Sequence, residues 1–331
     1  MTFAQHPDRS EGATSPTEPG NPWSASLTGL PWLRGNLHCH TTQSDGRLSP
    51  QDTIDWFANA GYQLLALTDH NTVTDPSGLD ARGMCLLTSS EVTAQGGELG
   101  GSYHLISLGL PTGAALPPVT AHVAESVARL REQGALVFIA HPHWSGLSVA
   151  DLTAGTRAGA AGIEIYNGGT VLDSRKGEAL THWDEGLGRG ERWWGIAVDD
   201  THWHTIDRAL GWVMVRAAEP SPRAVLDALA VGHFYASSGP EIQRVAFSRE
   251  GDDVYLSVET SPCAAIYALS YGSRNQFEFD REAAARGEAG STVTTASFKL
   301  RAGGPGGYVR IQCTDWQWRN AWSNPLYIPT S

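Results

Sequence analysis

The sequence contains no apolar run long enough to cross a membrane, which needs about 18 consecutive apolar residues. Its first residues are polar and rich in proline, glycine, serine and threonine, without the charged-then-apolar order of a signal peptide. The four cysteines are scattered and form no C-x-x-C pair, which favours a reduced chain. These absences predict a cytoplasmic protein that has no membrane partner.

Positive charge is also scarce. Lysine and arginine number 23 against 35 aspartates and glutamates, and the formal net charge is −12. Non-specific binding to nucleic acid requires a basic surface, so this composition argues against it. A phosphorylated small molecule is still compatible as a substrate, because bound metal cations would reverse the local sign of the charge.

The 331 residues fall into three parts by composition and hydrophobic pattern. Residues 1–25 predict a flexible tail, because such a polar segment buries little apolar surface. Residues 26–239 alternate strand and helix patterns, which predicts a parallel sheet in a closed or nearly closed barrel. Residues 240–331 alternate apolar and polar residues at period two, which predicts antiparallel hairpins in a small β-sandwich packed on the barrel.

The strand and helix patterns of the middle part give specific boundaries. Strands are expected over residues 33–40, 62–70, 83–94, 102–110, 135–143, 161–168, 192–202 and 209–217. Helices are expected over residues 49–61, 119–134, 174–190 and 221–232. The first helix has a clear start, with Ser49 as its cap and Pro50 in its first turn.

Histidines and acidic residues gather at the ends of these expected strands. His38 and His40 are two apart in a strand, so their side chains point the same way. Further imidazoles and carboxylates end or follow later strands: His70, Glu91, His104, His141, Asp200 and His202. In β/α barrels the carboxyl ends of the strands form the active-site face, so these side chains are expected to meet at one mouth.

The residue types of this set fit a metal site. A single histidine at a strand end is usually structural, and a lone H-x-H pair is a weak signal. The whole series is harder to explain structurally, and imidazole with carboxylate suits zinc, manganese or iron. Carboxylates among many histidines are typical of a hydrolytic centre with more than one metal, which generates a hydroxide near neutral pH.

Six stretches together resemble the polymerase-and-histidinol-phosphatase (PHP) family of metallohydrolases. They are "LHCHTTQSDG", "LALTDHNT", "SSEVTA", "YHLISLGL", "IAHPHW" and "DDTH", in the family's order. The C-terminal part, with "SSGPEI" and "AWSNP", resembles the branch that includes carbaryl hydrolases. The resemblance implies a distorted (β/α)7 TIM-like barrel that holds two or three divalent metal ions, with manganese, zinc or iron as the expected elements.

The resemblance also implies a ligand set for each metal. The first metal would be held by His38, His40, Glu91 and Asp200. Glu91 would bridge to a second metal, held also by His104 and His141. A third would be held by Asp45, His70 and His202, although many relatives have a histidine where Asp45 stands.

Other side chains near the expected mouth suit catalysis or substrate binding. His143 and His204 each lie two residues after an expected ligand, and each is a candidate proton donor or a hydrogen-bonding support for the site. Arg175 is a third catalytic candidate, because a guanidinium can bind an anionic oxygen bidentately. The expected substrate-binding residues are Tyr166, Asn167, Arg175 and Trp144.

These observations leave three functions open. The favoured function is a phosphoesterase that acts on a small phosphate monoester or diester with a metal-bridging hydroxide. The alternative keeps the metals and changes the electrophile to a carbamate, ester or amide carbonyl. A non-catalytic metal-binding module is least favoured, because structural zinc sites are closed and usually rich in thiolates.

Overall fold

The computed structural model describes residues 19–272, 275–300 and 307–327. Residues 1–18 of the expected tail lie outside this range, as do residues 273–274, 301–306 and 328–331 of the expected sandwich. The end of the expected tail is packed. The Gly20 amide donates to the Val231 carbonyl at 2.8 Å, and the nearly buried Trp23 ring stacks on Tyr235 at 5.8 Å between centroids. The packed chain therefore starts before residue 25.

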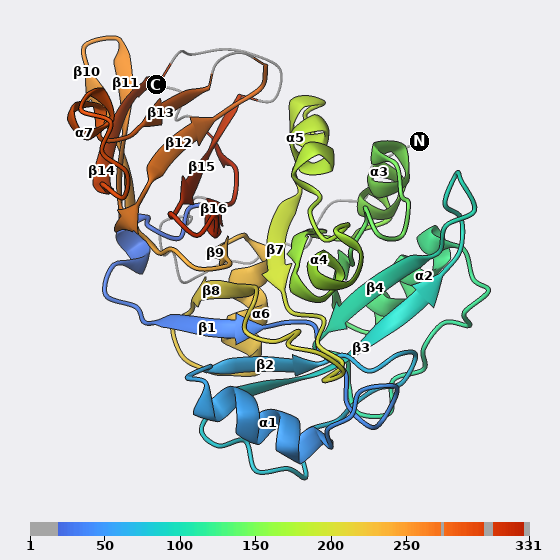
Figure 1. The fold of residues 1–331 in the computed structure, drawn as a ribbon. Helices are drawn as coiled ribbons and strands as arrows, with labels where there is room; N and C mark the ends of the chain where they lie inside the picture. Colours follow the sequence, from blue (N-terminus) through green and yellow to red (C-terminus); the bar gives the residue numbers. More distant parts are fainter. Residues whose placement is uncertain (1–18, 273–274, 301–306, 328–331) are drawn as a thin grey trace, which may run out of the picture.

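The protein has a mixed α/β fold built on one 14-stranded sheet that is rich in parallel pairs (Figure 1). Seven of its strands form the part of the sheet in or after which the expected metal-binding residues lie: β1 Trp32–Asn36, β2 Leu64–Leu67, β3 Cys85–Ala94, β4 Tyr103–Leu108, β5 Leu136–Ile139, β6 Gly162–Asn167 and β7 Trp194–Val198. They lie side by side in chain order. Pairs β1–β2, β2–β3, β5–β6 and β6–β7 are parallel, so their carboxyl ends share one edge.

Two parts of this sheet run against the expected parallel order. Strand β4 pairs antiparallel with both β3 and β5. The reason is length, because the eight residues between Ala94 and Tyr103 are too few for a crossover of a dozen residues or more. Strands β8 (Trp212–Arg216) and β9 (Phe234–Ser237) are also antiparallel, and β9 was not expected from the sequence. Within the described residues no ladder joins β7 to β8. The segments that follow β1 and β7 meet instead in a parallel bridge between Cys39 and Thr201, so backbone hydrogen bonds link β7 back to β1 at the edge where the strands end.

The four expected helices are present, shorter than expected, and local signals set their starts. They are α1 Pro50–Asn59, α2 Val123–Glu132, α5 Leu180–Gly188 and α6 Pro222–Ala230. Ser49 caps α1 by accepting from the Asp52 amide, and Pro50 follows at the first helical position. Figure 1 shows α1 outside β2, where Ile54 and Phe57 enter the same apolar cluster as Leu65.

Two further helices in this part were not expected. They are α3 Val149–Arg157 and α4 Gly168–Ser174. Helix α3 begins with a capping box, in which the Ser148 side chain and the Asp151 side chain each bond the other's backbone amide. That pair is a sequence signal for α3, whereas α4 starts on two glycines, which are poor helix formers.

The C-terminal strands gather at the upper left of Figure 1 around their own core. Three form a separate antiparallel sheet: β10 Ile242–Glu250, β11 Asp253–Cys263 and β14 Val293–Leu300. The others extend the large sheet: β12 Ala265–Leu269, β13 Gln276–Glu278, β15 Tyr308–Thr314, β16 Asn320–Ser323 and β17 Leu326–Tyr327. The short elements η1 (Ala25–Leu27) and α7 (Arg281–Ala285) complete the set. Because β16 pairs with β9, the sheet continues across the expected boundary at residue 240.

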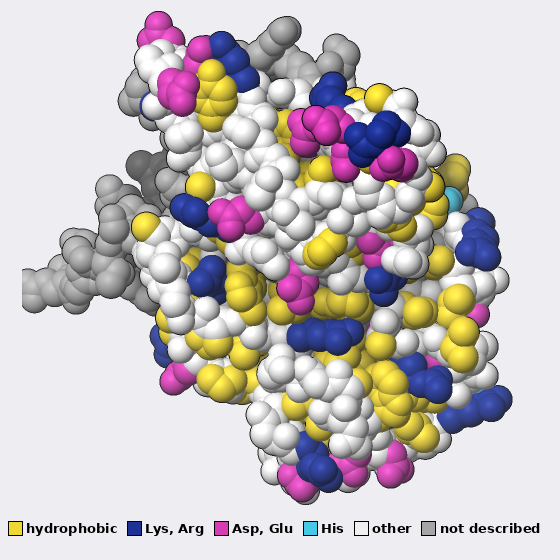
Figure 2. Space-filling model, turned by 60° about the vertical axis from the view of Figure 1, so that its left-hand side comes forward, with side chains coloured by type: hydrophobic (Ala, Val, Ile, Leu, Met, Phe, Trp, Pro, Cys, Tyr) yellow, Lys and Arg dark blue, Asp and Glu magenta, His cyan; other side chains and the backbone are white. Residues whose placement is uncertain are grey.

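The surface agrees with the acidic composition. On the face shown in Figure 2, lysine and arginine side chains lie singly or in small groups between acidic and apolar ones, without a continuous basic patch. Among the helices of the described residues, none combines the length and the apolar character needed to span a bilayer.

A buried arginine ties the C-terminal strands to the helical side of the molecule. Arg310 of β15 is 2% exposed and donates from Nε and Nη2 to the two carboxylate oxygens of Asp184 in α5, at 2.7 and 2.6 Å. Its guanidinium also lies 5.2 Å from the centre of the Trp183 ring. A bidentate, charge-assisted pair of this kind fixes orientation as well as adding energy.

We expect Arg310→Met to lower the free energy of unfolding by about 2–4 kcal/mol, because it removes two charge-assisted hydrogen bonds from a buried position. The matched control is Arg286→Met, which breaks an exposed bidentate pair with Glu288 and should change stability far less. Denaturant unfolding of both variants checks this. Equal losses in the two variants would contradict a special role for Arg310.

Candidate metal centre

The structure brings the nine expected metal-binding side chains together. They form four overlapping groups, and within each group the ligand atoms lie within 4.8 Å of one another. The groups are His38–Glu91–His141, His38–His40–Asp200, His70–Glu91–His104 and His40–Asp45–His70–His202. All nine residues come together although they are far apart in the sequence, because the strands that precede or contain them place them at one edge of the sheet.

Glu91 lies at the centre of the set. Its side chain is 1% exposed, and five imidazole nitrogens surround its carboxylate. The distances are 2.8 Å to His104 and 3.1 Å to His141 from Oε1, and 2.9 Å to His70, 3.2 Å to His40 and 3.3 Å to His38 from Oε2. Oε2 is buried and accepts no hydrogen bond. A buried carboxylate oxygen without a hydrogen bond, among nitrogen donors, is the environment that a divalent cation fits.

The His38 and His40 pair faces Asp200. Both Nε2 atoms lie 3.1 Å from Asp200 Oδ1 and 3.1 Å from each other. The other ring nitrogen of His38, Nδ1, lies 2.6 Å from the buried Glu164 carboxylate, so that side carries its proton. A cation that displaces any proton from Nε2 would therefore find the lone pair of this nitrogen aimed at the centre.

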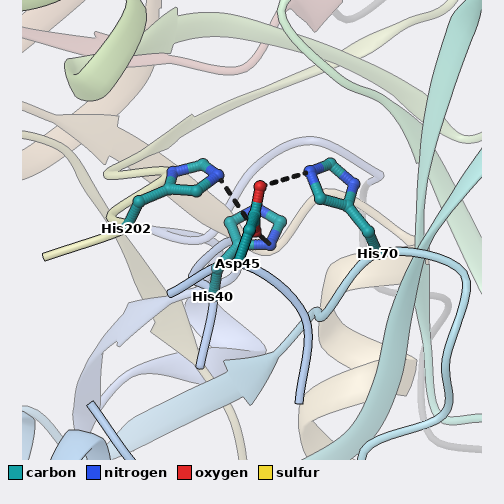
Figure 3. A group of neighbouring side chains, drawn as sticks. All are labelled: His40, Asp45, His70 and His202. Atoms are coloured by element: carbon teal, nitrogen blue, oxygen red, sulfur yellow. Dashed lines mark ion pairs between the residues drawn. The ribbon is translucent and has the colours of Figure 1, made fainter. Parts of the chain in front are cut away.

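The fourth group is more open (Figure 3). Asp45 is 54% exposed, and its carboxylate lies 3.5 Å from His202 Nε2 and 3.6 Å from both His70 Nε2 and His40 Nδ1. Gly46 follows Asp45 because a side chain there would not fit: a Cβ atom would stand 2.4 Å from the His40 carbonyl oxygen. The glycine thus lets the Asp45 loop fold back over His40.

His40 and His70 each face two of these groups through different ring nitrogens, and neither ring can ligate in both groups at once. His40 faces Asp200 through Nε2 and Asp45 through Nδ1, while His70 faces Glu91 through Nδ1 and Asp45 through Nε2. A neutral imidazole has one lone pair, so each ring can ligate through one nitrogen only. With His40 in the inner group, the outer group keeps Asp45, His70 and His202, which is the division that the resemblance implies.

Burial and charge shift the protonation of the inner residues. Burial by itself would lower the pKa of His38, but the carboxylates around it, Asp200 foremost, raise it well above its ordinary value. The same balance raises the pKa of His40 to about 9. Burial would raise the pKa of Glu91 and of Asp200, but the adjacent His38 holds both well below their usual range. When no cation is bound, these four side chains therefore form a network in which positive imidazoles face negative carboxylates.

Glu164 is a supporting residue that the sequence analysis missed. It is fully buried in β6 and accepts from His38 Nδ1, from the His141 amide at 2.7 Å and from the Asn167 side chain at 2.9 Å. The Asn167 amide also donates to Asp200 Oδ2 at 3.0 Å, so one buried pair orients three ligands. A glutamate inside the apolar segment "GIEIYN" was the available signal, because buried carboxylates need partners.

The backbone of the centre is strained at two ligands. His141 has φ 24° and Asp200 has φ 54°, both in the region that favours glycine. The Asp200 amide donates to the His38 carbonyl at 2.9 Å, and the His141 amide donates to Glu164. Such conformations persist where surrounding contacts impose them, and they cluster at functional sites.

A cavity of about 370 Å³ opens onto this centre. Its wall includes ligands of all four groups together with Trp144, Thr170, Asp173 and His204, and no lysine or arginine lines it. The Trp144 ring is 47% exposed and lies 5.0 Å from the His141 ring. The volume suits a small molecule, and the wall offers an anion no cationic side chain except protonated histidine.

Two of the expected catalytic and substrate-binding residues line the cavity, and the other four do not. His204 and Trp144 line it, and His204 Nε2 lies 3.1 Å from the Asp45 carbonyl. Asn167 is fully buried beside Asp200 and does not line the cavity, so it supports the ligands instead.

Three expected residues lie elsewhere. His143 is exposed and faces the Glu178 carbonyl at 3.2 Å, because β5 ends at Ile139 and the alternation of sides does not continue to residue 143. Arg175 ends α4 in a left-handed conformation and is exposed outside the cavity wall. Tyr166 of β6 does not line the cavity, and its ring lies 5.6 Å from the ring of Trp322 in the C-terminal part.

Comparisons with known proteins return PHP-like and related enzymes. No protein-family model matches the sequence. A 5'-3' exoribonuclease of Haemophilus influenzae is 34% identical over 105 residues, which are 30% of this chain and 36% of that protein. The chain therefore spans well under half the length of the relative it matches.

Three solved structures are similar to this chain at low sequence identity. A two-domain protein of Bacteroides vulgatus, containing a predicted PHP-like metal-dependent phosphoesterase, is 17% identical with a TM-score of 0.47 and covers 92% of this chain and 96% of its own. An amidohydrolase of Chromobacterium violaceum is 18% identical with a TM-score of 0.41, over 51% and 87%. A protein of Bifidobacterium adolescentis assigned as a metal-dependent phosphoesterase is 17% identical with a TM-score of 0.39, over 52% and 89%. The carbaryl-hydrolase branch of the resemblance stays a prediction.

We expect Glu164→Gln to lower the affinity for Zn²⁺ or Mn²⁺ by about 10–100-fold, because loss of a partner that orients a ligand has effects of this size. The control is Glu178→Gln, an exposed glutamate of the same region. Metal content is measured after dialysis against a chelator of known affinity, on variants whose thermal unfolding shows that they are folded. Unchanged affinity in Glu164→Gln would show that Glu164 does not orient the ligands.

Metal affinity should also depend on pH. With a pKa of about 9, metal-free His40 carries a proton at neutral pH that a bound cation must displace. We therefore expect the apparent affinity to fall as the pH falls, by up to about tenfold per pH unit for each proton displaced. Calorimetric titration in buffers of different ionisation enthalpy counts the released protons. Metal binding without proton release would contradict this assignment.

Proposed function

We propose that this chain is a PHP-like metal-dependent hydrolase, and that its substrate is a small phosphate ester. The observation that carries the proposal is the buried Glu91 carboxylate, which lies among five imidazoles and has one oxygen without a hydrogen bond. A structural salt bridge would need only one or two of these partners. The surplus of nitrogen donors is explained when more than one cation shares the carboxylate.

The residues would divide the work as follows. His38, His40, Glu91 and Asp200 would hold one cation, Glu91 with His104 and His141 a second, and Asp45 with His70 and His202 a third. Divalent cations bound there supply Lewis acidity, which polarises a phosphoryl oxygen and lowers the pKa of water. Glu164 and Asn167 would keep the ligands in place. Glu164 contacts the His38 ring and the His141 amide, and Asn167 contacts Glu164 and Asp200.

Two side chains on the cavity wall would act on the substrate. His204 donates from Nε2 to the Asp45 carbonyl, so it can give a proton to the departing oxygen only from Nδ1 of its imidazolium form; the neutral ring offers Nδ1 as an acceptor. Trp144 offers a partly exposed aromatic face beside His141, against which an apolar part of the substrate can pack.

One comparison favours a phosphate substrate over a carbonyl substrate, and the charge of the cavity wall permits it. The wall carries several carboxylates and no lysine or arginine, so bound cations would supply the positive charge that a phosphate needs. The relative that matches by sequence is the Haemophilus influenzae exoribonuclease. Exoribonucleases cleave phosphodiesters, and the match covers 36% of that protein. A carbamate, ester or amide substrate is the alternative, and a non-catalytic metal-binding module is the third possibility.

The test compares electrophiles on one protein preparation. We expect protein loaded with Mn²⁺, Zn²⁺ or Fe²⁺ to hydrolyse bis-p-nitrophenyl phosphate or p-nitrophenyl phosphate, and we expect a chelator to abolish this activity. p-Nitrophenyl acetate and an aryl N-methylcarbamate serve as the carbonyl substrates. Turnover of these alone would establish the alternative, and no turnover by protein that retains its metal would support the binding module.

A matched pair of histidine variants links activity to the centre. His141→Ala removes a proposed ligand, and we expect metal content to fall and activity to drop by at least about 100-fold, since a lost supporting contact alone can cost that much. His143→Ala lies two residues away, is exposed and does not line the cavity, so metal and activity should persist. Full metal content in His141→Ala would contradict its role as a ligand.

A further inference from the structure

A second cavity, of about 290 Å³, lies where the chain leaves β9 and meets the C-terminal strands. Its walls come from the turn after β9 (Gly239 and Pro240), from β11 (Ser261 and Pro262) and from the loop 315–319 that joins β15 to β16. The walls are closely fitted, because a Cβ atom on Gly239 would stand 2.7 Å from the Arg319 side chain. The cavity is therefore a shaped feature of the fold.

This cavity opens at the same end of the large sheet as the metal centre. Strand β8 runs antiparallel to β1, β9 antiparallel to β8, and β16 antiparallel to β9. Three reversals place the loop 315–319, which precedes β16, at the end where β1 leads into His38. Strands β16 and β1 are three spacings apart in the sheet, on the order of 14 Å.

The loop 315–319 presents two tryptophans to solvent. Trp316 is 46% exposed and Trp318 is 82% exposed, and Trp318 has a left-handed backbone with φ 62°. The Trp316 indole donates to the Ser291 carbonyl at 2.7 Å, which fixes its ring at the cavity wall. Two large aromatic side chains exposed within three residues are not explained by folding, because burial would stabilise them.

The charged side chains of the wall neutralise each other. Asp315 is nearly buried and receives Arg319 Nε at 2.8 Å and Nη2 at 2.7 Å, together with the backbone amides of Gln317 and Arg319. No other charged residue lines this cavity. An ion therefore finds no unpaired charge of opposite sign in this wall.

Neutral polar groups of the wall keep free hydrogen-bonding capacity. The Thr292 hydroxyl and the Gln317 side-chain amide line the cavity, and neither has a partner within the described part of the chain. Ser261 lines the same wall, and its Oγ accepts from the Glu241 amide at 2.9 Å. The wall therefore combines neutral donors and acceptors with the flat apolar faces of Pro240, Pro262 and Trp316.

We propose that this cavity binds a neutral saccharide. A sugar ring has apolar C–H faces that pack on tryptophan and proline, and an edge of hydroxyls that both donate and accept hydrogen bonds. It carries no charge, as the self-neutralised wall requires. Trp318, next to the cavity, would support a second ring of the same chain. This site is separate from the metal centre, and its test does not depend on hydrolase activity.

The experiment measures binding to the full chain directly. Cellohexaose, maltohexaose, xylohexaose and N-acetylchitohexaose are each tested by saturation-transfer difference NMR, followed by calorimetric titration of any that bind. We expect at least one to bind, and Trp316→Ala and Gln317→Ala each to weaken it by about tenfold or more, equal to about 1.4 kcal/mol. Trp318→Ala should weaken the hexasaccharide more than the matching disaccharide.

Two controls make the result specific to this cavity. Leu99→Ala removes an equally exposed apolar side chain elsewhere, and Trp144→Ala alters the metal cavity; neither should change saccharide binding. Thermal unfolding shows that each variant is folded, and Gln317→Ala remains informative if Trp316→Ala is not. Binding of none of the four saccharides would overturn the proposal. So would binding that only Trp144→Ala weakens, or binding of the aromatic probe p-nitrophenol in place of the sugars.

Discussion

The placement of one buried carboxylate governs the architecture of the centre. Glu91 lies in β3, with β1 and β2 on one side and β4 and β5 on the other. Its two oxygens divide accordingly: Oε2 contacts imidazoles that follow β1 and β2, and Oε1 contacts those of β4 and the end of β5. An isolated buried carboxylate is strongly unfavourable, so the surrounding histidines must carry protons or share cations with it. The strand order is thus the condition under which this charge can be buried at all.

The same requirement explains where the backbone is strained. His141 and Asp200 hold left-handed conformations, each at a cost of about 1–3 kcal/mol, and both contact the centre. Both residues lie two positions beyond the end of a strand, β5 for His141 and β7 for Asp200, where regular strand geometry has ended. Hydrogen bonds to Glu164 and to the His38 carbonyl hold the strained amides. Bound cations would add favourable energy to the same conformation, since they bind the folded arrangement and not the unfolded chain.

Sequence patterns located the ligands better than their surroundings, for a physical reason. Ligands in α/β proteins cluster at strand ends, and strand ends can be found from apolar runs, so residues as distant as His38 and Asp200 could be grouped in advance. The direction of β4 and the existence of β9 depend on loop length and on pairing partners, which apolar patterns do not encode. The sequence shows Glu164 only as one residue of an apolar strand. Its supporting role depends on its buried partners, His38 and the His141 amide, which are distant in the sequence. Arg175 and Tyr166 lie off the cavity wall for local reasons that apolar patterns do not encode: α4 ends at Arg175 in a left-handed conformation, and the register of β6 shifts between Glu164 and Tyr166.

The charge of the chain ties metal binding to substrate binding. Five carboxylates line the cavity with no lysine or arginine to balance them, those of Asp45, Glu91, Asp173, Asp200 and Asp207, and the whole chain carries a net charge of −12. A phosphate ester approaching the metal-free cavity would meet carboxylates of its own sign, in a region where low dielectric strengthens the repulsion. Loading the three proposed divalent cations would add six positive charges against these five carboxylates, which reverses the local sign. The acidic composition and a phosphate substrate are therefore compatible on one condition, that the cations bind before the substrate does.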